Sequence, residues 1–125
     1  MKHTFNPREL DVLKILLNSS EPMMSADIVN AKCGNDYLTQ STVTAVLRKL
    51  LNAEYIEVAG VTHSGKVLSR TYVVTDVART AIVEYIAEMY RPFVPILGIY
   101  SLIMAILSSF DEDTKKNLLM EIKKL

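Results

Sequence analysis

The residues best suited to chemistry lie in the segment 39–50, where helical spacing separates an apolar face from a polar face. Val43, Val46 and Leu47 recur at the spacing of one helix face and would point to a core. The other face carries small hydroxyls, an amide and two cations, and it has no acid. Such side chains can hydrogen-bond to base edges and phosphates, so the segment predicts a helix that lies in the major groove of DNA.

Each polar residue of this helix suits a particular contact with DNA. Gln40 can read adenine, Ser41 and the N-terminal amides suit a phosphate, and Arg48 suits the DNA backbone. The threonine methyls and Ala45 can contact a thymine methyl. The candidate DNA-binding residues are Gln40, Ser41, Thr42, Thr44, Ala45, Arg48, Lys49, Lys66 and Arg70. The alternative is an ordinary solvated face, and we favour DNA contact because a β-hairpin follows where a wing is expected.

The charge distribution is more informative than the charge total. The 125 residues include 14 Lys and Arg and 14 Asp and Glu, so the formal net charge is zero. Residues 37–53 and 58–75 nevertheless contain no acid, and together they can form a basic surface on a neutral protein. The second stretch carries Lys66 and Arg70, for which DNA contact and simple solvation both stay open, and His63, for which we favour solvation.

The elements that must position these residues can be placed from capping and periodicity. A first helix begins after Asn6, with Pro7 at its first position and a buried stripe of Leu10, Leu13, Leu16 and Leu17. A second helix, capped by Ser25, covers about residues 26–32, and the third begins at the cap Thr39.

Two strands follow the third helix. Tyr55–Ala59 and Ser69–Thr75 are rich in β-branched and aromatic residues, and Gly60–Leu68 between them reads as a flexible basic tip. The expected fold is mainly α with a small β-hairpin, a winged helix-turn-helix domain over residues 1–75. A C-terminal helical dimerisation region is expected over residues 76–125.

The C-terminal region is unusually apolar. A helix capped by Asp76 should be interrupted at Pro92 and Pro95, followed by an apolar helix over 96–109 and a last helix capped by Asp111. A helix that is apolar all round is buried, and a chain this small can bury one against a second copy of itself. The candidate dimerisation residues are Ile96, Ile99, Leu102, Ile103, Ile106, Leu107, Leu118, Leu119 and Ile122. A membrane anchor through 92–110 is the less favoured alternative.

Three stretches of the chain resemble the penicillinase-repressor family of bacterial transcription factors, which includes β-lactamase, methicillin-resistance and copper-responsive repressors. They are the Pro-Arg-Glu helix within 6–16, the recognition helix Ser-Thr-Val-Thr-Ala-Val-Leu-Arg-Lys-Leu over 41–50, and the end of the chain from Ser101 through Asp111-Glu112-Asp113. The resemblance implies a homodimer that binds a palindromic operator on double-stranded DNA and represses transcription.

The sequence also departs from that family in three places. Family members often have a basic residue at the position of Thr44 and threonine at that of Ala45. The Asn-Phe bond that is cut in proteolytically inactivated members aligns with Ala105-Ile106, and the tail lacks the cysteines of the copper-responsive branch.

Other classes of function find little support. The single cysteine, Cys33, excludes an internal disulfide and favours a reducing cytoplasm, and no pairing of residues suggests an enzyme, a metal site or a cofactor. A redox role for Cys33 is disfavoured. A winged-helix module that binds only proteins stays open as an alternative, as does an unknown effector or sensor protein as partner.

Overall fold

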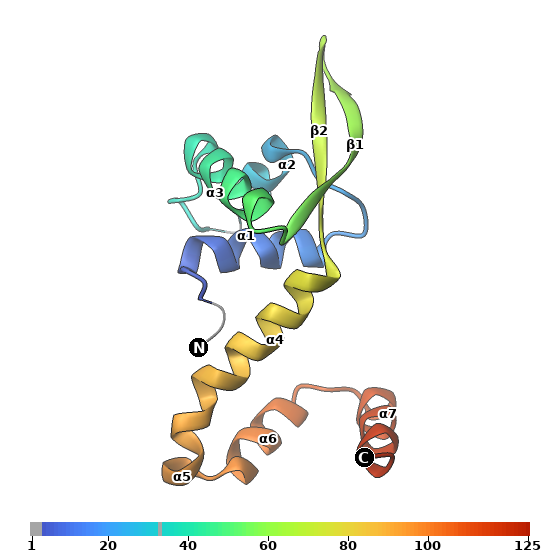
Figure 1. The fold of residues 1–125 in the computed structure, drawn as a ribbon. Helices are drawn as coiled ribbons and strands as arrows, with labels where there is room; N and C mark the ends of the chain where they lie inside the picture. The colour runs from blue at the N-terminus through green and yellow to red at the C-terminus, as the bar shows by residue number, and fades with distance from the viewer. Residues whose placement is uncertain (1–3, 33) are drawn as a thin grey trace. The chain divides into compact units, whose positions relative to one another are not determined.

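The computed structural model describes residues 4–32 and 34–125, and the chain divides after Ile86 into two compact units. The first unit contains three helices, a two-stranded sheet and most of a fourth helix (Figure 1). The architecture is mainly α with a small antiparallel hairpin, and it confirms the predicted winged helix-turn-helix. Cys33 lies outside the described residues.

Helix α1, Pro7–Asn18, begins as its capping signal predicts. The side chain of Asn6 accepts a hydrogen bond from the Glu9 N–H at 2.8 Å, and Glu9 accepts one from the Asn6 N–H at 3.1 Å. This reciprocal pair satisfies two amides that the helix itself leaves unpaired. Val12, Leu13 and Leu16 face the core, whereas the predicted stripe residue Leu17 is 36% exposed and Leu10 is half-buried.

Helix α2, Ser25–Asn30, is shorter than predicted, and its cap residue is Met24 rather than Ser25. The Asp27 carboxylate accepts the Met24 N–H at 3.1 Å, so an acid inside the first turn replaces the expected serine cap. Helix α3, Gln40–Asn52, begins as predicted, because the Thr39 side chain accepts the Thr42 N–H at 3.3 Å.

The wing is a regular hairpin of strands β1, Ile56–Ser64, and β2, Val67–Val74. The prediction of a flexible tip over residues 60–68 was therefore wrong. β-Branched Val61 and Thr62 continue the pairing opposite Arg70 and Ser69, and only Gly65 and Lys66 are left for the turn. Gly65 has a φ of +65°, a conformation that favours glycine.

Backbone hydrogen bonds join the base of the wing to the loop between α1 and α2. Met23, in the loop between α1 and α2, exchanges two backbone hydrogen bonds with Tyr72 of β2, at 2.8 and 3.2 Å. Helix α4, Asp76–Tyr90, begins next, and its cap is the Thr75 hydroxyl rather than Asp76, since that hydroxyl accepts the Ala78 N–H. Ala78 and Ala81 at the start of α4 are fully buried in the core of the first unit.

The core of the first unit joins all of these elements. Phe5 contacts Tyr55 and Tyr85, with ring centroids 5.3 and 5.4 Å apart. The buried apolar residues are Phe5, Val12, Leu13, Leu16, Ile28, Leu38, Val43, Val46, Leu47, Leu50, Ile56, Val74, Ala78 and Ala81. This single core fixes α3 and the wing in one body.

The second unit, Ala87–Leu125, is helical throughout. After α4 come a 3-10 turn over Arg91–Phe93, α5 over Val94–Leu97, α6 over Ile99–Leu107 and α7 over Glu112–Lys123. The prediction of one helix over 96–109 was wrong, because the backbone turns at Gly98, where φ is +77°. None of the helices in the described residues is both long and apolar enough to cross a membrane.

Asp111 caps α7 as predicted, by accepting the Thr114 N–H at 2.7 Å. Hydrogen bonds from the side chain and the backbone of Thr114 favour the charged carboxylate and so lower the pKa of Asp111. The cap therefore fixes where α7 begins, and its apolar stripe includes Leu118, Leu119 and Ile122.

Candidate nucleic-acid interface

Helix α3 places its polar residues on the outside of the first unit. Val43, Val46, Leu47 and Leu50 are buried beneath it. The predicted contact residues Gln40, Ser41, Thr44, Ala45, Arg48 and Lys49 are all exposed, and Thr42 is half-buried. The helix thus presents one continuous polar and acid-free face to solvent, as its periodicity predicted.

Gln40 and Thr44 already have hydrogen-bond partners in the free protein. The Thr44 hydroxyl donates to the backbone carbonyl of Gln40 at 2.8 Å. The Gln40 amide nitrogen donates to the Ser25 hydroxyl at 3.1 Å and to Thr44 at 3.3 Å. The Thr44 methyl group is therefore the part best placed for an apolar contact, whereas Gln40 must release at least one partner before it can pair with adenine in the predicted way.

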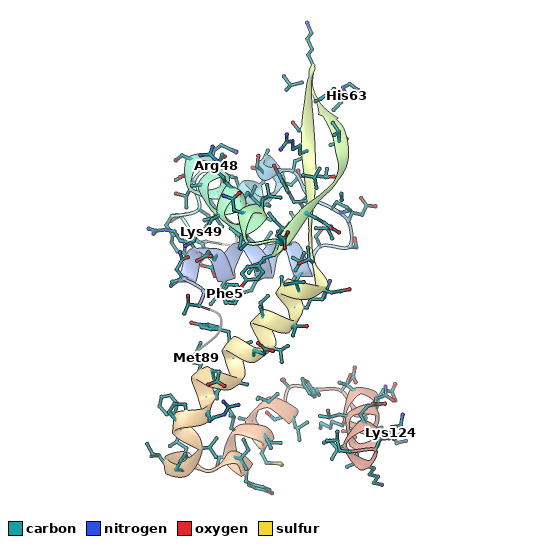
Figure 2. All side chains as sticks on the ribbon, viewed as in Figure 1. Phe5, Arg48, Lys49, His63, Met89 and Lys124 are labelled. Carbon is teal, nitrogen blue, oxygen red and sulfur yellow. The ribbon has the colours of Figure 1, made fainter. Side chains whose placement is uncertain are left out.

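Arg48 and Lys49 are neighbours in the sequence, but they differ in their ion pairing. The Lys49 ammonium lies 3.4 Å from a carboxylate oxygen of Glu9, which is only 5% exposed. Lys49 therefore balances a buried charge at the start of α1. Figure 2 shows Lys49 on the side of α3 toward α1 and Arg48 on the side away from it. Arg48 has no acidic partner among the described residues.

The first turn of α3 carries a group of hydroxyls. Thr39 lies 3.2 Å from the Ser41 hydroxyl and donates to that of Thr42 at 3.1 Å. These groups surround the amides at the helix N-terminus, where an anion such as a phosphate is favoured by the helix dipole. The assignment of Ser41 to a phosphate stays a prediction.

The predicted cations of the wing lie at different distances from the tip of the hairpin. Lys66 is in the turn, and Figure 2 shows His63 near the far end of the hairpin. Arg70 lies further down β2, and with Arg48 it lines a hollow of about 260 Å³ between α3 and the wing. The far part of the wing also exposes Val61, Val67 and Leu68, so its surface is apolar as well as basic.

The angle between α3 and the wing is held by a tight connection. Glu54, just after α3, has a φ of +62°, a left-handed conformation that costs a non-glycine residue about 1 kcal/mol. Its carbonyl accepts the Thr75 hydroxyl at 2.8 Å, and the next amide, that of Tyr55, donates to Leu50 at 2.9 Å. The turn closes α3 directly onto the paired ends of both strands, so the helix and the wing form one surface.

Sequence reasoning missed several residues near this surface. Ser25 and Tyr72 line the hollow together with Arg48 and Arg70, although they come from α2 and β2. Arg8, at the start of α1, lies over the Tyr37 ring at 5.6 Å from its centroid. Packing between elements far apart in the sequence brings these residues together, and no sequence spacing encodes it.

Across residues 4–32 and 34–125, no three His, Cys, Asp or Glu residues lie together in a way that could hold a metal ion. The second unit has an apolar hollow of about 220 Å³ among Tyr90, Phe93, Val94, Leu97, Gly98 and Leu102. The predicted effector or sensor partner stays a prediction.

Comparison with solved structures identifies similar folds. A MarR/EmrR family transcriptional regulator from Acinetobacter sp. ADP1 aligns with a TM-score of 0.50 and 22% identity over 98% of this chain and 75% of that one. The zinc-responsive MarR family member ZitR from Lactococcus lactis aligns with a TM-score of 0.52 and 17% identity over 98% and 75%. A MepR mutant from a multidrug-resistant S. aureus clinical isolate aligns with a TM-score of 0.51 and 15% identity over 95% and 74%.

The chain matches no protein-family model and no curated protein sequence. At these low identities the structural likeness concerns the fold, which is that of winged-helix transcriptional regulators. The narrower resemblance to penicillinase repressors was not confirmed.

Proposed function

We propose that the protein is a cytoplasmic, sequence-specific DNA-binding transcriptional regulator that acts as a repressor. In this proposal a homodimer binds a palindromic operator, with α3 of each protomer in a major groove and the wing against the adjacent backbone. The narrower assignment to the penicillinase-repressor family rests on the three sequence stretches that resemble it.

One observation carries the proposal. The exposed face of α3 and the adjoining part of the wing contain no acid between residues 37 and 53 or between 58 and 75, although the protein as a whole is neutral. The hydrogen bonds around Glu54 join these two parts into one surface. A neutral protein gains nothing in stability from collecting its free cations on one side, whereas a polyanion is attracted to such a surface.

The exposed apolar side chains of the second unit support the homodimer. No described side chain of the second unit is buried. Ile96 is 77% exposed, and most of the predicted interface residues on α6 and α7 are at least one-third exposed. Helices with this much exposed apolar surface need a partner, and a second copy supplies an identical surface while pairing two DNA-binding units.

A module that binds only proteins is the competing function. It too would explain net neutrality, but it gives no reason for hydroxyls, an amide and an arginine without an acidic partner among the described residues on one face of α3. The two functions differ in their dependence on salt, because DNA binding releases counterions from the phosphates and protein binding does not.

Salt-dependent binding tests the proposal. Arg48, Lys66 and Arg70 have no acidic partner among the described residues, so roughly four phosphate contacts are expected in a dimer if Arg48 and Arg70 share one phosphate, and roughly six if they do not. Affinity for a specific duplex should then fall about 10²- to 10³-fold between 50 and 200 mM salt. The measurement is fluorescence anisotropy with the protein's own promoter and with an unrelated duplex of equal length. Preference for the promoter that weakens with salt supports the proposal, whereas equal and salt-insensitive binding favours the protein-interaction module.

A further inference from the structure

We propose that the hollow between α3 and β2 is a receptor for one phosphate group of the DNA backbone, shared by Arg48 and Arg70. This inference rests on the proposed function and adds a defined ligand site to it. It also gives Arg70 a specific role, because this wing residue then acts together with the recognition helix on one phosphate.

The charges in the hollow point to an anion. Arg48 and Arg70 both line it, and none of its lining residues is Asp or Glu. Neither arginine has an acidic partner among the described residues. Other cations are paired: Lys14 with Asp11, Lys49 with Glu9 and Arg79 with Asp76. Two positively charged residues that line one unfilled space repel each other, and an anion bound between them would relieve that repulsion.

The neutral groups of the hollow fit a phosphate as well. The Ser25 hydroxyl accepts a hydrogen bond from Gln40, which leaves its own proton free to donate to an incoming oxygen. Tyr72 also lines this space. Guanidinium groups bind phosphate oxygens in pairs of parallel hydrogen bonds, so two arginines and the Ser25 hydroxyl can together bind a tetrahedral anion.

Geometry favours a phosphate of DNA over a free one. The hollow opens beside the face of α3 that carries Thr44, which also lines it. A backbone phosphate bound here therefore sits next to a base contacted by α3, and it sets the depth and register of the helix in the groove. Phosphate contacts of this kind position a protein on the duplex, whereas base contacts supply the sequence preference.

The test combines arginine variants with DNA that lacks one charge. A duplex is first selected from a random pool with the wild-type protein. Single methylphosphonate linkages are then placed along each half-site, and affinities are measured for wild type, Arg48→Ala, Arg70→Ala and the double variant. Arg79→Ala, an exposed arginine of α4, is the control, and circular dichroism checks that every variant is folded.

The expected results are specific. Each single variant weakens binding at least about 10-fold, and the double variant is scarcely weaker than either, because both remove the same contact. One methylphosphonate position per half-site weakens wild type and has no further effect on either arginine variant. Arg79→Ala binds like wild type.

Three outcomes would overturn the inference. Additive losses, or different sensitive phosphates for Arg48 and Arg70, would show two separate contacts while leaving the proposed function intact. Unchanged binding by the methylphosphonate duplexes, together with NMR shifts of the two guanidinium groups in inorganic phosphate, would make the hollow a site for a small phosphate. Failure of folded wild-type protein to select any duplex would end the proposed function, and this inference with it.

Discussion

Replacing Thr44 by glutamate is expected to abolish specific DNA binding while leaving the fold intact. Thr44 is exposed in the middle of the polar face of α3, so the new carboxylate would meet the phosphates that line the groove. It also comes one turn before Arg48, where a Glu–Arg pair forms readily on a helix and would occupy that guanidinium. Like charges brought together in an interface cost several kcal/mol, so affinity should fall at least about 10²-fold.

Stability should hardly change in this variant. The Thr44 hydroxyl bonds only within the exposed turn, to Gln40, and glutamate is a better helix former than threonine. We expect a change of less than about 0.5 kcal/mol in the free energy of unfolding. Thr80→Glu, at an exposed position of α4, is the matched control. Wild-type affinity in folded Thr44→Glu protein would remove α3 from the mechanism.

The second large effect concerns the dimer. Replacing Ile103 by aspartate should convert the protein from a dimer to a monomer of 14.0 kDa. Ile99, Ile103 and Ile106 are spaced to lie on one face of α6, and all three are exposed in the single chain. Losing two buried isoleucines, one per protomer, removes about 4 kcal/mol, and burying two carboxylates costs more. The dimer dissociation constant should rise at least about 10³-fold.

Light scattering after size-exclusion chromatography gives the mass directly, over a range of protein concentrations. Ser101→Asp introduces the same charge on the opposite face of α6, at an exposed position, and should stay dimeric. When dimerisation is lost, operator affinity should also fall, because a single protomer contacts only one half-site. A dimeric Ile103→Asp protein of unchanged affinity would exclude this face of α6 from the interface.

The features predicted correctly from the sequence are those that depend on residues close together in the chain. The caps Asn6, Thr39 and Asp111 all accept the expected backbone hydrogen bonds, because a cap involves residues only three positions apart. The buried face of α3 followed from periodicity for the same reason. The failed cap at Ser25 shows the limit of such signals, since Asp27 satisfies the first turn instead.

Features that depend on tertiary context were harder to predict. The turn residues His63, Ser64 and Gly65 suggested a loop, yet cross-strand pairing carries the hairpin nearly to its end. Likewise, the apolar segment 96–109 was predicted as one helix, but the backbone turns at Gly98 and α6 begins only after it. The hollow around Arg48 and Arg70 depends on strand register, and the contact of Lys49 with the buried Glu9 joins residues 40 positions apart in the sequence.

The most direct test of a dimer with α3 in the major groove is a methylation-interference footprint. Guanine N7 lies in the major groove, so methyl groups there block only proteins that enter it. On the selected duplex we expect two symmetric blocks of interference, separated by about one helical turn, roughly 10 base pairs, or a multiple of it. A single block, or specific binding without interference in the major groove, would contradict the account.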